Sequence, residues 1–245
     1  MPRSLRNWTP APAAEPPRAR FPERGGPAHL MDTLIDNLPS ILAGFRDTLY
    51  LLGAAGLIAV VAGVLLAAMR VSPVPVLRGV GTTYVNVFRN IPLVVLFLIT
   101  TQGLPQLGLG FSFFVLAVLA LGTYTAAFVC EAVRSGINAV DVGQAEAARS
   151  LGMTFGQTLQ EIVLPQAVRS VIPPIASILI ALTKNTAIAE AFGVTEATYQ
   201  LDSLVRDVPS ALYALFFGIA AGYVLIVFAI SGAAQLLERR LVVVR

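Results

Sequence analysis

Long apolar runs, divided by single charged residues or short polar segments, make up most of the chain after residue 47. A helix that crosses a bilayer needs about 20 consecutive and mostly apolar residues. Five stretches meet that length, and we predict membrane spans at about residues 48–69, 81–102, 111–130, 166–186 and 208–237. The pattern therefore predicts an all-α membrane protein with five transmembrane helices.

Glycine and proline indicate the turns and close contacts of these spans. Residues 90–130 contain no charge and are too long for one helix. The glycines and proline at 103–105 and 108–110 therefore predict a tight turn between spans two and three. In the fifth span, Gly218 and Gly222 stand four residues apart, a spacing that lets a neighbouring helix approach closely.

Residues 1–30 differ in composition from the rest of the chain. They hold seven of the 16 prolines and five arginines, with no apolar run, so burial would not offset the entropy lost on ordering them. We predict a disordered tail that lacks the apolar region of a signal peptide. Met31 opens a more ordinary sequence, and an alternative is that the native protein starts there. Residues 31–245 are expected to form the transmembrane domain.

The overall composition agrees with a membrane protein. Of the 245 residues 56% are hydrophobic and 13% are charged, and the mean hydropathy is +0.76, which is too apolar for an ordinary soluble domain. The net charge is +3 and the pI is near 9.3. The basic residues are nevertheless scattered between apolar stretches and form no stripe, so we expect a lipid bilayer and no nucleic acid as partner.

Side chains that carry chemistry are few. The single cysteine, Cys130, cannot form an internal disulfide, and the single histidine, His29, cannot build a zinc site or a Ser/His/Asp triad. The only lysine, Lys184, follows Thr183, so the Gly-Lys pair of a phosphate-binding loop is absent. We predict that the chain is not an enzyme and binds no metal or cofactor. If a nucleotide supplies energy, another subunit must bind it.

Arginines are distributed unevenly over the connections between the spans. The connections after spans one and three and the C-terminal end carry Arg70, Arg78, Arg134, Arg149, Arg169, Arg239, Arg240 and Arg245. The positive-inside rule then places the C terminus in the cytoplasm and the N terminus outside. The five arginines of residues 1–30 oppose this orientation, and we set them aside because the eight other positions agree.

The connection at residues 141–165 has the signals of two short helices with a sharp corner between them. Gly152 suits the left-handed conformation that ends a helix, and Thr154 with Gln157 makes a capping box that begins the next one. The second helix is expected to stop at Pro165. Such a compact protrusion suits insertion into a groove on a soluble partner.

This segment resembles the EAA loop of the membrane subunits of ABC importers. The match in residue type and spacing is carried by Glu146, Ala147, Ala148, Gly152, Ile162, Leu164 and Pro165. Residues 88–93, 131–137 and 182–188 are similar to the polar amino acid branch of that family, and the resemblance covers about residues 31–240. It implies a type I ABC importer permease fold, with residues 141–165 as the cytoplasmic loop that couples transport to ATP hydrolysis.

The resemblance also implies partners. In the family the loop docks on a cytoplasmic ATPase dimer that binds ATP and Mg, and an extracytoplasmic amino-acid-binding protein delivers the substrate. Because five spans cannot enclose a path alone, a second permease is expected around a two-fold axis, and a homodimer and a heterodimer remain open. The implied location is a bacterial inner, or plasma, membrane.

The motif at residues 88–93, in the predicted second span, implies the substrate. The common form in the family is Arg-Gly-Thr-Pro with a glutamine four residues after the proline, whereas here Asn90 and Ile91 replace Gly-Thr and Leu96 stands at the glutamine position. An asparagine directly after the arginine makes this motif similar to that of the glutamate transporters. A polar amino acid is therefore implied, with a glutamate-like one favoured.

Polar residues inside the second span and at the end of the fourth are candidates for the substrate path: Arg89, Asn90, Lys184, Asn185 and Thr186. The alternatives are that Arg89 snorkels or pairs with a helix terminus and that residues 184–186 anchor the span at the interface. Three residues apart on one helix, Glu131 and Arg134 are expected to form a local pair. Cys130 and the pair Tyr124 and Phe128 are expected to serve in packing.

A different class of function also remains open. The alternative is an ATP-independent secondary transporter or channel. Such a protein needs no docking site for a cytoplasmic ATPase. It also usually has more than five spans or inverted repeats. We find no internal repeat, so the sequence favours the importer permease.

Overall fold

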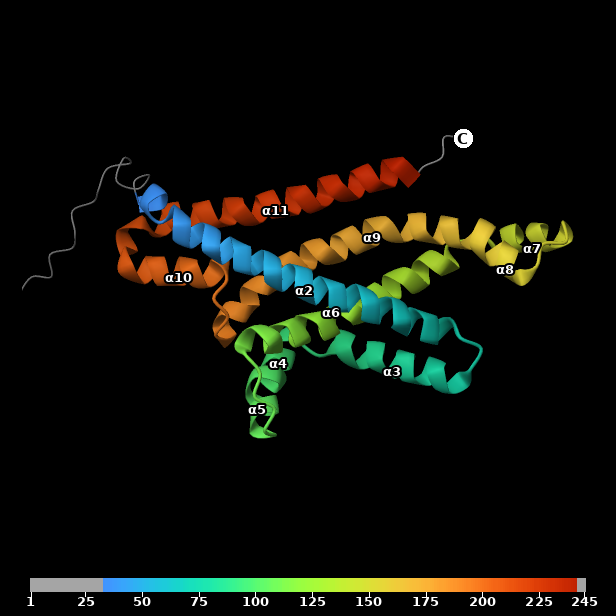
Figure 1. The fold of residues 1–245 in the computed structure, drawn as a ribbon, viewed down its shortest axis with the longest axis horizontal. Helices are drawn as coiled ribbons and strands as arrows, with labels where there is room; N and C mark the ends of the chain where they lie inside the picture. The colour runs from blue at the N-terminus through green and yellow to red at the C-terminus, as the bar shows by residue number, and fades with distance from the viewer. Residues whose placement is uncertain (1–32, 242–245) are drawn as a thin grey trace, which may run out of the picture.

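The computed structural model describes residues 33–241, which are mostly helical, with no strand among them (Figure 1). Five helices form most of the fold: α2 (Leu38–Val71), α3 (Pro75–Asn90), α6 (Phe113–Asn138), α9 (Leu164–Asn185) and α11 (Leu212–Leu241). Shorter elements connect them: α4 (Leu93–Leu98), η2 (Ile99–Gly103), α5 (Leu104–Gln106), α7 (Val142–Ser150), α8 (Phe155–Gln157), η3 (Thr158–Val163), η4 (Thr186–Phe192), α10 (Ala197–Asp207) and η5 (Pro209–Ala211). The predicted tail at residues 1–30 lies outside the described residues.

Four helical runs of the described chain are long and apolar enough to cross a membrane: Leu38–Val71, Phe113–Asn138, Phe155–Phe192 and Pro209–Arg240. A fifth span results only if α3 and the helical run Leu93–Gln106 are taken together. The all-α prediction is confirmed. The spans are also longer than predicted, because the helices continue beyond the apolar stretches from which their bounds were taken.

The second predicted span, residues 81–102, is not one straight helix. The chain bends by 103° between α3 and the run Leu93–Gln106, because Pro92 has no amide proton and disfavours the helical conformation at the residue before it. Ile91 is accordingly extended. In Figure 1, α4 and α5 point away from the layer formed by α2, α3 and α6.

The turn expected at residues 103–105 is also corrected. Helical structure continues through these residues as η2 and α5 and ends at Gln106. The chain then turns at Gly108, whose φ of +80° is a backbone conformation that favours glycine. Of the two predicted turn signals, only 108–110 marks the end of the helix.

Close packing through small residues joins the central helices. A side chain at Gly63 of α2 would collide with Val129 of α6, and one at Gly122 of α6 would collide with Ile58. A side chain at Gly222 of α11 would likewise collide with the ring of Phe45 on α2. At the glycine of the fifth span the space is thus filled by an aromatic ring from α2, whereas the helix that packs most extensively along α11 is α9.

The helix predicted to stop at Pro165 instead continues into the fourth span. The helical run Phe155–Phe192 has 38 residues, and Pro165 lies in the first turn of α9. Just before it, η3 is π-helical, and the amide of Leu164 donates to the carbonyl of Leu159 five residues back. This wider turn accommodates the proline ring without ending the helix.

Helix α10, which the sequence analysis did not predict, is held in place by a buried carboxylate. Glu196 has 0% of its surface exposed and accepts hydrogen bonds from the backbone amides of Thr198 and Tyr199 at 2.7 and 3.0 Å. Its second oxygen accepts from the hydroxyls of Tyr223 at 2.6 Å and Thr48 at 3.3 Å. These contacts join α2, α10 and α11.

We expect Glu196→Ala to destabilise the protein more than the same substitution at an exposed glutamate does. Losing the helix cap costs about 1 kcal/mol, and each buried donor left unpaired costs about 1–3 kcal/mol more. The measurement is the thermal midpoint of the detergent-solubilised protein, with the exposed Glu238→Ala as the matched control. Equal midpoints for the two variants would contradict the anchoring role of Glu196.

Candidate functional site

A capped corner forms at residues 141–165, at the end of the molecule beyond α9 (Figure 1). Asp141 caps α7 by accepting from the amide of Gly143 at 2.7 Å. Gly152 has a φ of +82°. The amide of Thr154 donates to the side chain of Gln157 at 2.9 Å, and the amide of Gln157 donates to the Thr154 hydroxyl at 3.4 Å. The predicted glycine conformation and capping box are both confirmed.

Further contacts make the corner rigid. The amide of Gly152 donates to the carbonyl of Arg149 at 2.9 Å, and the amide of Met153 donates to that of Ala148 at 3.2 Å. Ala148 is buried, and α7 packs against η3. The last turn of α7 and the start of α8 are thus fixed relative to each other.

Most other predicted residues of this segment face outward. Glu146, Ala147, Leu164 and Pro165 are exposed, and Ile162 is half-buried. At the corner itself, Leu151 and Phe155 are 83% and 81% exposed. The tip of the corner therefore presents two large apolar side chains that the rest of the described chain leaves uncovered.

The corner extends beyond any bilayer. At 1.5 Å per residue the 38-residue run Phe155–Phe192 is about 57 Å long, nearly twice the hydrocarbon thickness of about 30 Å. Leu151 and Phe155 lie at the end of this run, next to polar segments. The run is therefore long enough to cross the hydrocarbon layer and still continue beyond it.

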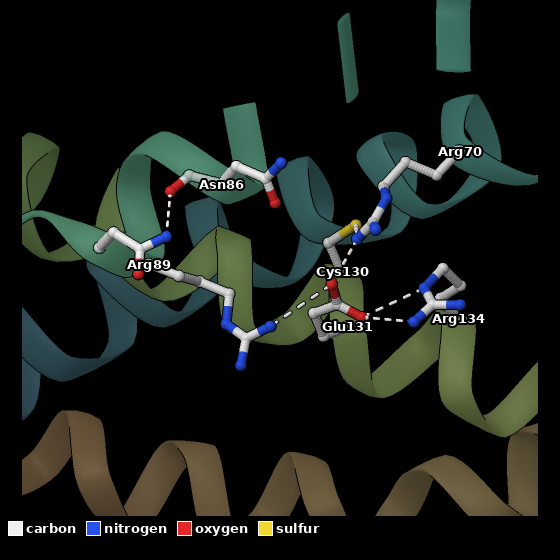
Figure 2. A network of polar contacts seen from close by, with 7 residues as sticks. Arg70, Asn86, Arg89, Cys130, Glu131 and Arg134 are labelled. Atoms are coloured by element: carbon white, nitrogen blue, oxygen red, sulfur yellow. Dashed lines mark hydrogen bonds and ion pairs between the residues drawn. The ribbon is translucent and has the colours of Figure 1, made fainter. Parts of the chain in front are cut away.

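A second cluster of polar contacts surrounds Glu131 on α6 (Figure 2). The carboxylate pairs with Arg134 at 2.9 Å, which confirms the predicted local pair. It also pairs with Arg70 of α2 at 2.6 Å and with Arg89 of α3 at 3.4 Å. The sequence analysis missed both additional arginines, because the helices that bring them together are far apart along the chain.

Arg89 and Asn90 therefore have structural partners. The guanidinium of Arg89 lies 5.6 Å from the centre of the Phe128 ring in addition to its pairing with Glu131. The side-chain amide of Asn90 donates to the carbonyl of Asn86 at 2.6 Å, at the end of α3. Cys130 is fully buried, as predicted for a packing residue.

A cavity of about 250 Å³ lies between α6 and α9. Its polar and aromatic lining comes from Tyr124, Thr125, Phe128, Ser177 and Asn185. The rings of Tyr124 and Phe128 contact each other, with centroids 5.0 Å apart, so they pack as predicted and also line a space. Of the predicted path residues at the end of α9, Asn185 faces this cavity.

The two other path candidates on α9 lie elsewhere. Lys184 lines a separate cavity of about 340 Å³ with Thr198, Phe216 and Tyr223. Thr186 is fully buried, and its hydroxyl donates to the carbonyl of Thr183 at 2.6 Å. Lys184 and Asn185 thus line different cavities, and Arg89 is in the lining of neither.

A bundle of long apolar helices that continues at one end into a capped corner defines an integral membrane protein. Residues 59–243 match the family described as binding-protein-dependent transport system inner membrane component. The chain belongs to this family.

Individual relatives agree with the family assignment. The chain is 42% identical over 223 residues to the glutamate transport system permease protein GluC of Corynebacterium efficiens, covering 85% of this chain and 98% of the relative. It is 37% identical over 210 residues to the probable glutamine ABC transporter permease protein GlnM of Bacillus subtilis, covering 85% and 96%. A crystal structure of an amino acid ABC transporter with histidines matches with 34% identity and a TM-score of 0.79, covering 85% of this chain and 97% of that one. The resemblance to ABC importer permeases is confirmed.

Proposed function

We propose that this chain is the permease subunit of an ABC importer for a polar amino acid, with a glutamate-like substrate favoured. The observation that carries the proposal is the rigid corner at residues 141–165, which has the residue types of a coupling loop and an exposed apolar tip. The names of relatives that transport glutamate or glutamine support the substrate class.

The corner is proposed to dock on a separate ATPase dimer, which holds the ATP and Mg. Leu151 and Phe155 would enter an apolar groove, and Glu146 would meet donors at its rim. Because the capping box and the glycine turn fix the corner, movement of the ATPase would be transmitted to α9, which is continuous with α8 and η3. In this proposal the corner and the C terminus lie in the cytoplasm, and the N terminus lies outside.

A second permease and a binding protein complete the proposed importer. In α6, 61% of the spanning stretch is buried within this chain, against 11% for both the α9 run and α11. Faces of α9 and α11 are therefore available to a second permease and to lipid. The cavity between α6 and α9 is the proposed part of the substrate path, and Asn185 is the path candidate that lines it.

Substrate competition tests the proposed substrate class. In cells that contain the whole system, unlabelled glutamate is expected to suppress uptake of labelled glutamate at concentrations at which arginine and a sugar do not. The physical reason is that the second carboxylate of glutamate would be attracted electrostatically by the arginine-rich cluster next to the cavity. Preferred uptake of arginine or of the sugar would reject a glutamate-like substrate.

A further inference from the structure

The cluster around Glu131 carries more positive than negative charge. One carboxylate pairs with three guanidinium groups, those of Arg70, Arg89 and Arg134. Glu131 lies seven residues before the end of α6, and the side chains of Arg70 and Glu131 are 12% and 22% exposed. Charges so removed from water are costly unless they are paired. The cluster therefore gains free energy when another anionic group arrives.

Arg89 is the member of the cluster that is held most weakly. Arg70 binds Glu131 at 2.6 Å, and Arg134 donates to it twice, at 3.1 and 2.9 Å. Arg89 approaches no closer than 3.4 Å, and 45% of its side chain is exposed. In Figure 2 it reaches Glu131 from the side opposite to Arg134. Arg89 can leave while the two other arginines still neutralise the carboxylate.

Phe128 connects Arg89 to the cavity between α6 and α9. The guanidinium lies 5.6 Å from the centre of the Phe128 ring, and the same ring lines the cavity. Tyr124, Ser177 and Asn185 supply polar groups there. The volume of about 250 Å³ is just below the range of about 300–1,000 Å³ for drug-sized ligands, and it suits a small solute such as an amino acid.

We propose that Arg89 exchanges partners during transport. In the empty permease it pairs with Glu131, and in the loaded permease it leaves Glu131 and binds a carboxylate of the substrate over the Phe128 ring. The class of ligand is a small amino acid carboxylate, so the inference rests on the proposed function. Glu131 serves as the resting partner, which keeps Arg89 from being left unpaired when no substrate is present.

Direct binding of radiolabelled glutamate to the purified permease–ATPase complex, without the binding protein, tests the exchange. Arg89→Gln is expected to weaken binding at least tenfold, and Arg89→Lys less, because an ammonium keeps the charge without the planar fork of the guanidinium. Arg78→Gln is the matched control, since it removes the same group from an exposed position of the same helix outside the cluster, and it is expected to change binding less than threefold. Elution as an intact complex on size exclusion is required of each variant.

Removing the resting partner, Glu131, is expected to change glutamate binding in the opposite direction. Glu131→Gln frees Arg89 from its competitor and is expected to tighten glutamate binding several-fold, whereas a purely structural Glu131 would only weaken it. Wild-type binding by Arg89→Gln would overturn the exchange. The exchange would also be overturned by a lipid-dependent defect in vesicle transport. If Arg89→Gln impaired transport in phosphatidylglycerol vesicles but not in phosphatidylcholine vesicles, Arg89 would be assigned to a lipid headgroup. Failure of the proposed function is distinct, since the wild-type complex would then bind no amino acid.

Discussion

Glu146→Lys is expected to release the ATPase from the permease. Glu146 is exposed on α7, and in the proposed complex its carboxylate would meet donors or basic groups of the ATPase. Reversing the charge converts an attraction into a repulsion, and like charges brought together at an interface cost several kcal/mol. Since each 1.4 kcal/mol is about tenfold in affinity, co-purified ATPase should fall at least tenfold.

The control for this variant is Glu238→Lys. Glu238 is exposed on α11, so the substitution makes the same change in net charge away from the corner. It is expected to leave co-purification of the ATPase at the wild-type level, and both variants should insert and elute normally. Wild-type amounts of ATPase with Glu146→Lys would show that α7 does not form the dock.

Gly152→Val should separate ATP hydrolysis from transport. With a φ of +82° at this position, a side chain would be strained, although an added Cβ would meet no atom within 4 Å. The cost is therefore backbone strain alone, about 1–3 kcal/mol for a residue held in such a region. Relieving it turns α7 relative to α8, and the stimulation of ATP turnover by the binding protein in reconstituted vesicles is expected to fall at least fivefold.

Two variants control for Gly152→Val. Asparagine tolerates the left-handed conformation, so Gly152→Asn should retain most of the stimulation. Gly156→Ala, placed in the helical conformation of α8 with open space around it, should behave as wild type. If Gly152→Val retains full stimulation while the ATPase stays bound, the angle of the corner does not matter for coupling.

Local chemistry explains which parts of the corner could be predicted from sequence. The capping box needs only Thr154 and Gln157, three residues apart, and the left-handed turn needs only Gly152. Both depend on the backbone of the residues between them, so the spacing is sufficient. The end of the second helix was predicted wrongly at Pro165, because the π-helical turn that accommodates the proline leaves no simple signal in sequence.

Contacts between distant segments explain what could not be predicted. Glu131 and Arg134 are neighbours on one helix, whereas Arg70 is 61 residues from Glu131 along the chain. Thr48 and Glu196 are 148 residues apart, and their hydrogen bond depends on how α2 and α10 pack. The bend after Asn90 is an intermediate case: Pro92 signals it, but the apolar stretch alone suggested one continuous span.

The most direct test of the importer assignment is glutamate accumulation in vesicles that contain this chain with its ATPase and second permease, with the binding protein outside. We predict that labelled glutamate accumulates against its gradient only when ATP is enclosed and the binding protein is present, and that omitting the ATPase abolishes accumulation. Equal accumulation without the ATPase, driven by an ion gradient, would contradict the account and assign the chain to ATP-independent transport.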